Sequence, residues 1–182
     1  MILANDYQQQ AARTLIDAPD NTYTNEEMVL VLNALRLAGE AAAIANTIKK
    51  AVFHRHPLNR AGLHTDLLQL IDSAANLETP DQAPPMDDNQ IMALWNAIGL
   101  IGEAGELALL VRDVIAANAR FDRERIADEA GDNLWYLAAL CTKLGIPMSE
   151  VMEQNIAKLK RRFPDGWDVE RSINRADGDA EG

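Results

Sequence analysis

The chain has 182 residues, of which 48% are apolar and 25% are charged, and its formal net charge is −11. This composition is ordinary for a globular protein of one domain or two small ones. The negative charge argues against general nucleic-acid binding, because that affinity comes mostly from Lys and Arg on phosphates. The single cysteine, Cys141, leaves no partner for an intrachain disulfide, and we interpret it as a small buried apolar side chain.

The N-terminal segment MILANDYQQQ lacks the basic and apolar regions of a signal peptide. No run of about 18 uninterrupted apolar residues occurs, so we expect no membrane span. These observations together predict a cytoplasmic protein.

Apolar periodicity, caps and breakers predict helices along the chain and no strand. Thr24 and Glu27 have the spacing of a capping box, Asp122 is a candidate N-cap, and Gly145 ends a helix after Lys143. The expected helices cover residues 5–17, 24–53, 63–77, 90–118, 123–144 and 147–163. The expected loops and linkers are HRHPLNRAG (54–62), the acidic ETPDQAPPMDDN (78–89) and the turn at 119–122.

The sequence also contains an internal repeat. Residues 28–77 align without a gap on residues 91–140 at a constant offset of 63, with ten identities in fifty pairs, most of them near Gly39. We therefore predict an all-α fold, an antiparallel helical bundle built from a tandem, diverged duplication of a helix–turn–helix unit. The repeats would be residues 1–80 and 81–167, packed as one compact domain and followed by a flexible polar tail at 168–182.

Two acid pairs mark the second copy, in the segments GLIGEAGELALL and DEAGD: Glu103 with Glu106, and Glu129 with Asp132. Residues three apart share a helical face, and the turn at 119–122 would place the two pairs within about two helical turns of each other. Four carboxylates in an apolar bundle repel each other unless they take up protons or hold a cation. Ligand sets made only of oxygen suit Mg²⁺ or Mn²⁺.

Three glycines lie beside these acids and would make room for another backbone, a metal or a ligand: Gly102, Gly105 and Gly131. The alternative interpretation is a solvated helix face on which the acids pair with nearby arginines: Arg112, Arg123 and Arg125. The apolar neighbours of the acids argue against a fully wet face.

The motif E-x-x-E, a 22-residue spacer and E-x-x-D resembles the MazG-like all-α nucleoside triphosphate pyrophosphohydrolases. Related groups are the dimeric dUTPases, the dCTP pyrophosphatases and the phosphoribosyl-ATP pyrophosphohydrolases. The resemblance is strong over residues 90–167, including DEAGDNLWYLAAL and EQNIAKLKRRFP, and weaker over 5–77. It implies that the four acids hold Mg²⁺, with Mn²⁺ as a substitute, and that a nucleoside triphosphate binds there. Water would attack the α-phosphorus to give a nucleoside monophosphate and pyrophosphate, with Glu106 as our candidate general base.

The resemblance also assigns substrate-binding residues. Lys158 and Arg162 match a K-x-x-x-R pattern that contacts phosphates, Tyr136 matches an aromatic that stacks on the base, and Asn155 matches a residue without an assigned role. The alternatives are a solvated helix end for the two basic residues and core packing for Tyr136. Trp95 would either line the nucleoside pocket or pack in the core.

The first copy departs from the motif, because its equivalent positions are Glu40, Ala43, Asp66 and Gln69. Two acids are too few for the same metal cluster, so we expect residues 5–77 to be a catalytically inactive built-in partner of the active copy. We also expect a homodimer, because the long Ala- and Leu-rich helices leave apolar surface over. The histidines of the HRH segment are interpreted as turn polarity rather than metal ligands.

Two competing functions use the same residues. A catalytically silent helical module for nucleotide binding or oligomerisation would keep the fold, but the intact acid motif in the second copy argues against it. A phosphoribosyl-ATP enzyme shares the fold and the acids, although a half-degenerate duplication would be unusual there. Nothing in the sequence specifies the preferred base or sugar.

Overall fold

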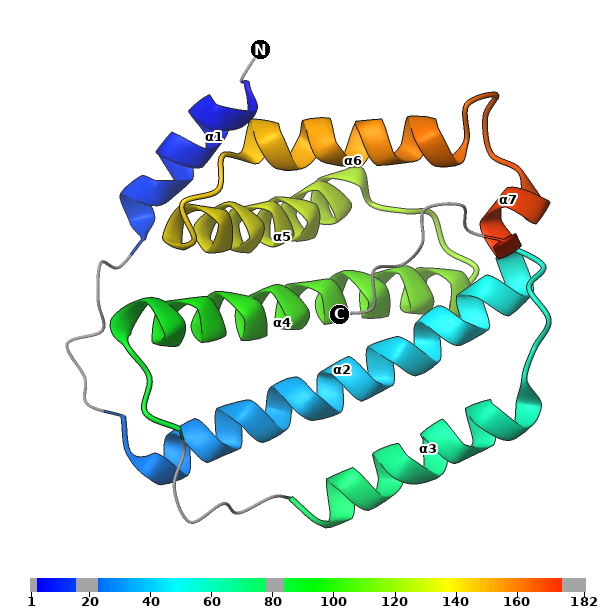
Figure 1. The fold of residues 1–182 in the computed structure, drawn as a ribbon, viewed down its shortest axis with the longest axis horizontal. Helices are drawn as coiled ribbons and strands as arrows, with labels where there is room; N and C mark the ends of the chain where they lie inside the picture. The colour runs from blue at the N-terminus through cyan, green and yellow to red at the C-terminus, as the bar shows by residue number, and fades with distance from the viewer. Residues whose placement is uncertain (1–2, 16–22, 78–83, 175–182) are drawn as a thin grey trace. The chain divides into compact units, whose positions relative to one another are not determined.

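The computed structural model describes residues 3–15, 23–77 and 84–174, and these residues form helices and no strand (Figure 1). The all-α prediction is confirmed. The elements in chain order are α1 (Ala4–Ala11), the short 3-10 helix η1 (Ala12–Thr14), α2 (Asn25–Phe53), α3 (Arg60–Ala75), α4 (Asp88–Ala116), α5 (Arg123–Lys143), α6 (Met148–Arg162) and α7 (Val169–Asn174).

Most predicted helix bounds agree with the structure to within a few residues. The exception is α7, which lies in the segment that we expected to be a flexible tail, with Ser172 buried. The last part of that tail, residues 175–182, lies outside the described residues. So do residues 78–83 of the acidic linker.

The two long helices, α2 and α4, both begin with a capping box. At the start of α2, the Thr24 backbone N–H donates to Glu27 Oε2 (2.7 Å) and the Glu27 N–H donates to Thr24 Oγ1 (3.2 Å). Asp87 and Gln90 form the equivalent capping box at the start of α4. Both boxes satisfy backbone N–H groups that a helix leaves without an internal partner.

The helix bounds repeat with the offset found in the sequence. Helices α2 and α4 both contain 29 residues, and their first residues differ in number by 63. Helices α3 and α5 begin at Arg60 and Arg123, which differ by the same 63. Each is capped by the side chain of the preceding residue, Asn59 or Asp122, which accepts from backbone N–H groups of the first turn.

The chain divides into two compact units. The first contains residues Met1–Val31 and Gln82–Glu150, and the second contains Leu32–Asp81 and Val151–Gly182. This division passes through α2 and the start of α6, so each unit draws on both halves of the sequence. The boundaries of the two repeats, and their packing as one domain, stay predictions.

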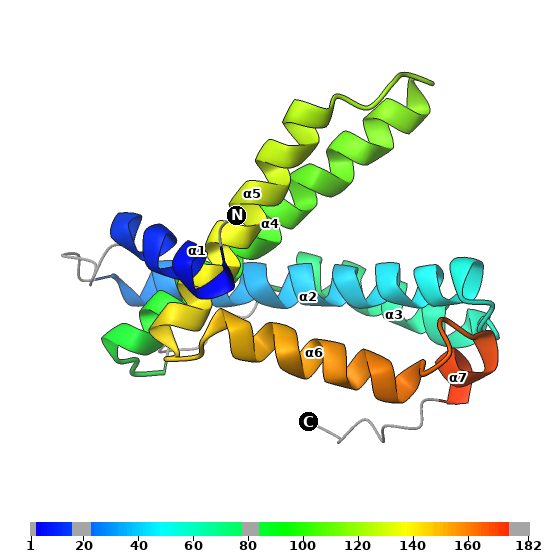
Figure 2. The same ribbon diagram turned by 90° about the horizontal axis from the view of Figure 1, so that it is seen from above.

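In the first unit, α4 and α5 lie side by side as an antiparallel hairpin (Figure 2). Its buried side chains are mostly small or apolar: Met92, Asn96, Leu110, Ala138, Ala139 and Cys141. The buried Asn96 is satisfied, because its Nδ2 donates to the carbonyl of Met92 one turn earlier (2.7 Å). Cys141 is buried as expected, and its desolvation raises the pKa of the thiol.

Helix α1 packs against α5 and is tied to its C-terminal end by polar side chains. Gln8 Nε2 donates to the carbonyl of Ile146 (2.9 Å), while Gln8 Oε1 accepts from the Met148 N–H (2.9 Å). Asn5 Oδ1 accepts from the Ser149 N–H (3.0 Å). The side chains of α1 therefore cap the first turn of α6.

The second unit contains the hairpin of α2 and α3, whose side chains meet at Arg36, Glu40 and Ser73. Its histidines contact the C-terminal segment: His56 Nε2 lies 3.2 Å from Ser172 Oγ, and the His54 ring lies edge-on to Trp167 at 5.8 Å. These contacts agree with the interpretation of the HRH histidines as polar residues of a turn.

Among the described residues, α2 and α4 are long and apolar enough to cross a membrane when judged by length and composition alone. This is weak evidence for a span, because core helices of globular proteins pass the same test.

Candidate metal centre

The α4–α5 hairpin brings three of the four predicted acids together. Glu103 and Glu106 lie one turn apart on α4, and Glu129 faces them from α5. One carboxylate oxygen from each residue lies within 4.8 Å of the other two. Asp132 lies one turn after Glu129 but outside this group, with an exposed side chain.

The cluster is electrostatically unfavourable without a cation. Desolvation raises the pKa of Glu103, and the negative charges of Glu106, Asp132 and Glu129 raise it further. The carboxyl of Glu103 therefore holds its proton more tightly in the folded chain than in the unfolded chain. A bound cation would reverse this effect by favouring the ionised form.

The donor set fits a hard divalent cation. All its ligand atoms are carboxylate oxygens, which Mg²⁺ and Mn²⁺ prefer, and no Cys or His joins the group among the described residues. Mg²⁺ usually keeps several waters among its ligands, so three protein carboxylates are enough to hold it. Glu103, Glu106 and Glu129 are the residues that would hold the metal.

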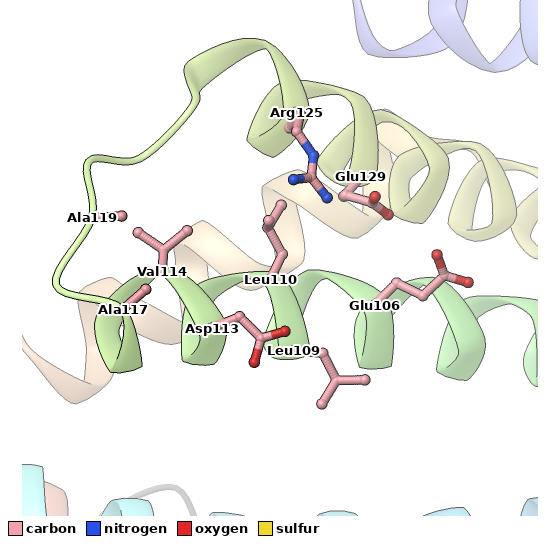
Figure 3. A pocket seen from close by; sticks show the side chains of 9 residues that line it. All are labelled: Glu106, Leu109, Leu110, Asp113, Val114, Ala117, Ala119, Arg125 and Glu129. Atoms are coloured by element: carbon pink, nitrogen blue, oxygen red, sulfur yellow. The ribbon is translucent and has the colours of Figure 1, made fainter.

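An open cavity of about 460 Å³ adjoins the cluster. Figure 3 shows Glu106 on α4 and Glu129 on α5 at one end of this cavity, with the Arg125 side chain extending beside Glu129. The remaining lining residues come from the end of the hairpin: Leu109, Leu110, Asp113, Val114, Ala117 and Ala119. The cavity thus joins acids to one arginine, a combination that suits a metal-bound polyanion.

Arg125 and Asp113 were not among the predicted site residues. Arg125 precedes Glu129 by four residues, one turn along the same face of α5, and this spacing was the available signal. Arg112, which we considered as a partner of the acid cluster, instead pairs with Asp113 (2.7 Å). Arg125, by contrast, lies beside Glu129 as the alternative of a solvated, arginine-balanced face expects, so that alternative is met in part.

Tyr136 lies one turn beyond Asp132 on α5 and packs against the backbone of Gly99 on α4. A Cβ atom at residue 99 would overlap with the ring of Tyr136. The Tyr136 ring also meets Trp135 edge-on, with 4.9 Å between centroids, and Trp135 Nε1 donates to Thr14 Oγ1 (2.8 Å). These contacts fix Tyr136 one turn from Glu103 and Asp132. They favour a packing role and leave a contact with a base as a prediction.

Trp95 lies two turns before Glu103 on α4 and is 38% exposed. It lines a second, mostly apolar cavity of about 220 Å³ in the first unit. The other lining residues are Tyr23, Glu27, Met28, Val31, Ile91, Leu94 and Ile98. Trp95 is therefore not fully buried in the core.

The glycines beside the acids have open space around them. A Cβ atom at Gly102, Gly105 or Gly131 would meet no heavy atom within 4 Å in the described chain. Among the described residues, no neighbouring atom therefore occupies the space beside these three glycines.

The remaining predicted substrate residues lie on α6, in the second unit: Asn155, Lys158 and Arg162. The side chains of Asn155 and Lys158 are exposed, and that of Arg162 is partly exposed. Their contact with phosphates stays a prediction.

The fold and the acidic cluster together define an all-α protein with a group of three carboxylates that could hold a metal ion. Comparison with known proteins agrees with this class. Residues 95–167 match the family described as the MazG nucleotide pyrophosphohydrolase domain. The Gene 37 protein of Mycobacterium phage L5 is 31% identical over 105 residues, which cover 55% of this chain and 89% of the phage protein. No solved structure matches the chain.

The chain belongs to the MazG-like superfamily. The matched region begins at Trp95 and contains all four motif acids, Tyr136 and the predicted residues of α6. The strong resemblance found in the second half of the sequence is therefore confirmed, and the weaker one over residues 5–77 stays a prediction.

Proposed function

We propose that this protein is a Mg²⁺-dependent nucleoside triphosphate pyrophosphohydrolase that converts a nucleoside or deoxynucleoside triphosphate and water to the monophosphate and pyrophosphate. The observation that carries the proposal is the cluster of three carboxylates at one end of a cavity that also contains Arg125. Membership of the MazG-like superfamily supports the same reaction. Removal of unwanted nucleotides from the cellular pool is the role that we expect.

Each residue of the site has a task in this proposal. Glu103, Glu106 and Glu129 would hold the cation, with Asp132 available as a further ligand. When bound, the cation neutralises phosphate charge, orients the chain of phosphates and lowers the pKa of the attacking water. Arg125 would bind a phosphate oxygen in the cavity, whereas the contact of Lys158 and Arg162 with phosphates stays what the family resemblance implies. Asn155 has no specific task in this scheme.

The general base must reach a water molecule while it remains ionised. Glu106 is the candidate, because its side chain is exposed and lines the cavity, whereas Glu103 is only partly exposed and does not line it. Glu106 would accept a proton from water as the water oxygen attacks the α-phosphorus. The bond between the α-phosphorus and the oxygen that bridges to the β-phosphorus breaks, and pyrophosphate leaves with the electron pair.

A homodimer is part of the proposal. Only 6% of the most apolar stretch of α4 is buried, and exposed apolar residues such as Ile101 and Ile115 lie along this helix. A second copy would cover this surface. Molar-mass measurement by light scattering would show a dimer, whereas a monomer at micromolar concentration would contradict this part of the proposal.

The decisive experiment measures pyrophosphate release from a panel of canonical, deoxy and modified nucleoside triphosphates and phosphoribosyl-ATP, with and without Mg²⁺. Glu106→Ala should abolish metal-dependent release. Asp128→Asn is the matched control, because Asp128 precedes Glu129 on α5 but belongs neither to the cluster nor to the cavity lining. Absence of release from every triphosphate would favour the silent binding module, whereas equal release by Glu106→Ala would show that the acid cluster is not the catalytic centre.

A further inference from the structure

The α2–α3 hairpin contains a partly buried hydrogen-bond network that links an arginine to a carboxylate. Arg36 Nη1 donates to Ser73 Oγ (3.2 Å), and Ser73 Oγ donates to Glu40 Oε1 (3.2 Å). Arg36 Nη2 also donates to Asn33 Oδ1 (3.3 Å). Ser73 and Asn33 are each only 6% exposed, so the guanidinium is held among buried polar atoms.

These residues match the metal-centre hairpin at the offset of 63 that the helix bounds also follow. Glu40 corresponds to Glu103, which is the acid with the raised pKa in the candidate metal centre. Asn33 corresponds to Asn96, and both are buried. The two hairpins therefore place an acid and a buried amide at equivalent positions.

At two further equivalent positions, the hairpins have the large and the small side chain on opposite helices. Arg36 corresponds to Gly99, and Ser73 corresponds to Tyr136. In the α4–α5 hairpin the ring of Tyr136 packs on Gly99, which has no side chain. In the α2–α3 hairpin the large side chain comes from the opposite helix, and the small Ser73 leaves room for it. A reciprocal exchange of this kind indicates that Arg36 fills a specific space.

The charges are exchanged as well. The α4–α5 hairpin collects three carboxylates, whose repulsion favours a bound cation. The α2–α3 hairpin has Ala43 and Gln69 at two of the four motif positions and keeps Glu40 and Asp66. In this hairpin the guanidinium of Arg36 donates to Ser73, which donates to Glu40, so a fixed positive charge lies one hydroxyl group away from that carboxylate.

We propose that the guanidinium of Arg36 is the resident cation of the α2–α3 hairpin and stands where the α4–α5 hairpin takes a divalent metal. The α2–α3 hairpin then binds no divalent cation, and each chain has a single metal site. This inference rests on the proposed function only for the statement that the α4–α5 hairpin binds metal.

The first test counts metal sites on the full-length protein by Mn²⁺ titration, followed by electron paramagnetic resonance of free Mn²⁺. Glu40→Gln should keep the wild-type number of bound ions per chain, whereas Glu103→Gln should lose them. A loss of bound Mn²⁺ in Glu40→Gln would overturn the inference and leave the proposed function intact. A wild-type chain that binds no Mn²⁺ would instead count against the proposed function.

The second test is independent of metal and uses the urea midpoint of unfolding in EDTA for four proteins: wild type, Arg36→Met, Glu40→Gln and the double variant. If Arg36 balances Glu40, Glu40→Gln lowers the midpoint in the wild type but raises it in the Arg36→Met background, where the carboxylate has lost its cation. A midpoint that falls by the same amount in both backgrounds would overturn the inference. Should Arg36→Met alone fail to fold, recovery of folding in the double variant is the expected result, and failure of both would count against it.

Discussion

The ring of Tyr136 lies on the backbone of Gly99, so that a single methyl group at residue 99 would overlap with Cε1 of the tyrosine. The tyrosine has little freedom to move away, because Trp135 meets it edge-on and Trp135 is itself hydrogen-bonded to Thr14. This contact joins α4 and α5 one turn from Glu103, and it therefore sets the separation of the two helices that carry the acids.

Gly99→Ala should destabilise the protein. Overpacking costs about 1–3 kcal/mol, which exceeds the gain of about 1 kcal/mol from replacing glycine by alanine in a helix. Chemical denaturation would measure the difference in the free energy of unfolding. The matched control is Gly39→Ala in α2, where the added Cβ meets no atom within 4 Å, and this variant should be more stable than the wild type. A Gly99→Ala protein as stable as Gly39→Ala would show that the contact with Tyr136 is not close.

Glu103→Gln should stabilise the metal-free protein at neutral pH. The raised pKa of Glu103 means that the folded chain binds its proton more tightly than the unfolded chain, in which the pKa is near 4.5. The stability that the protonated carboxyl contributes is therefore fully present below the pKa of the unfolded chain. It is lost as the pH rises through the higher pKa that Glu103 has in the folded chain. The glutamine variant lacks this loss, so its advantage over the wild type should grow with pH.

Adding Mg²⁺ or Mn²⁺ should reverse the order of the two proteins. The metal binds the ionised carboxylate and stabilises the folded wild type by mass action, whereas Glu103→Gln has lost a ligand. Thermal unfolding from about pH 4 to 8, with EDTA or with divalent cation, would measure both effects. An equal rise in melting temperature with metal for both proteins would place Glu103 outside the metal site.

Gln8→Ala should lower the stability of the first unit. Gln8 joins α1 to the segment after α5 through the Ile146 carbonyl and the Met148 N–H. Each of the two hydrogen bonds contributes about 0.5–1.5 kcal/mol net, so we expect a loss of about 1–3 kcal/mol in the free energy of unfolding. Gln9→Ala is the matched control, because Gln9 is exposed and neighbours Gln8 in the same helix. Hydrogen exchange at the start of α6 should increase in Gln8→Ala only.

The sequence was sufficient to predict the helices because their caps and breakers are local. Thr24 with Glu27 and Asp122 cap α2 and α5 as expected. Helix α7 was missed because it is short and polar. Its buried Ser172 meets His54 and His56, which are more than a hundred residues earlier in the chain, and no local pattern contains that information.

The candidate site was predictable where it depends on helical spacing and less so where it depends on packing across the hairpin. The spacing of Glu103, Glu106 and Glu129 was enough to bring them together. Asp132 falls outside that group, because the direction of a side chain at the edge of a helix face is not set by spacing alone. Gly99 was not singled out, although it is the glycine that a neighbouring side chain approaches most closely, because its partner Tyr136 lies on the other helix.

Arg125→Met should weaken substrate binding more than turnover. Arg125 lines the cavity beside Glu129, so its guanidinium is placed to bind a phosphate oxygen of the triphosphate. A hydrogen bond to a charged group contributes about 1.5–3 kcal/mol, which corresponds to a roughly tenfold to hundredfold rise in KM. Steady-state kinetics at saturating Mg²⁺ would measure KM and kcat separately. Arg123→Met is the matched control, because Arg123 begins the same helix but does not line the cavity, and its KM should stay at the wild-type value. A normal KM for Arg125→Met would mean that the phosphates avoid this cavity and depend on other cations, of which Lys158 and Arg162 would be the next to replace.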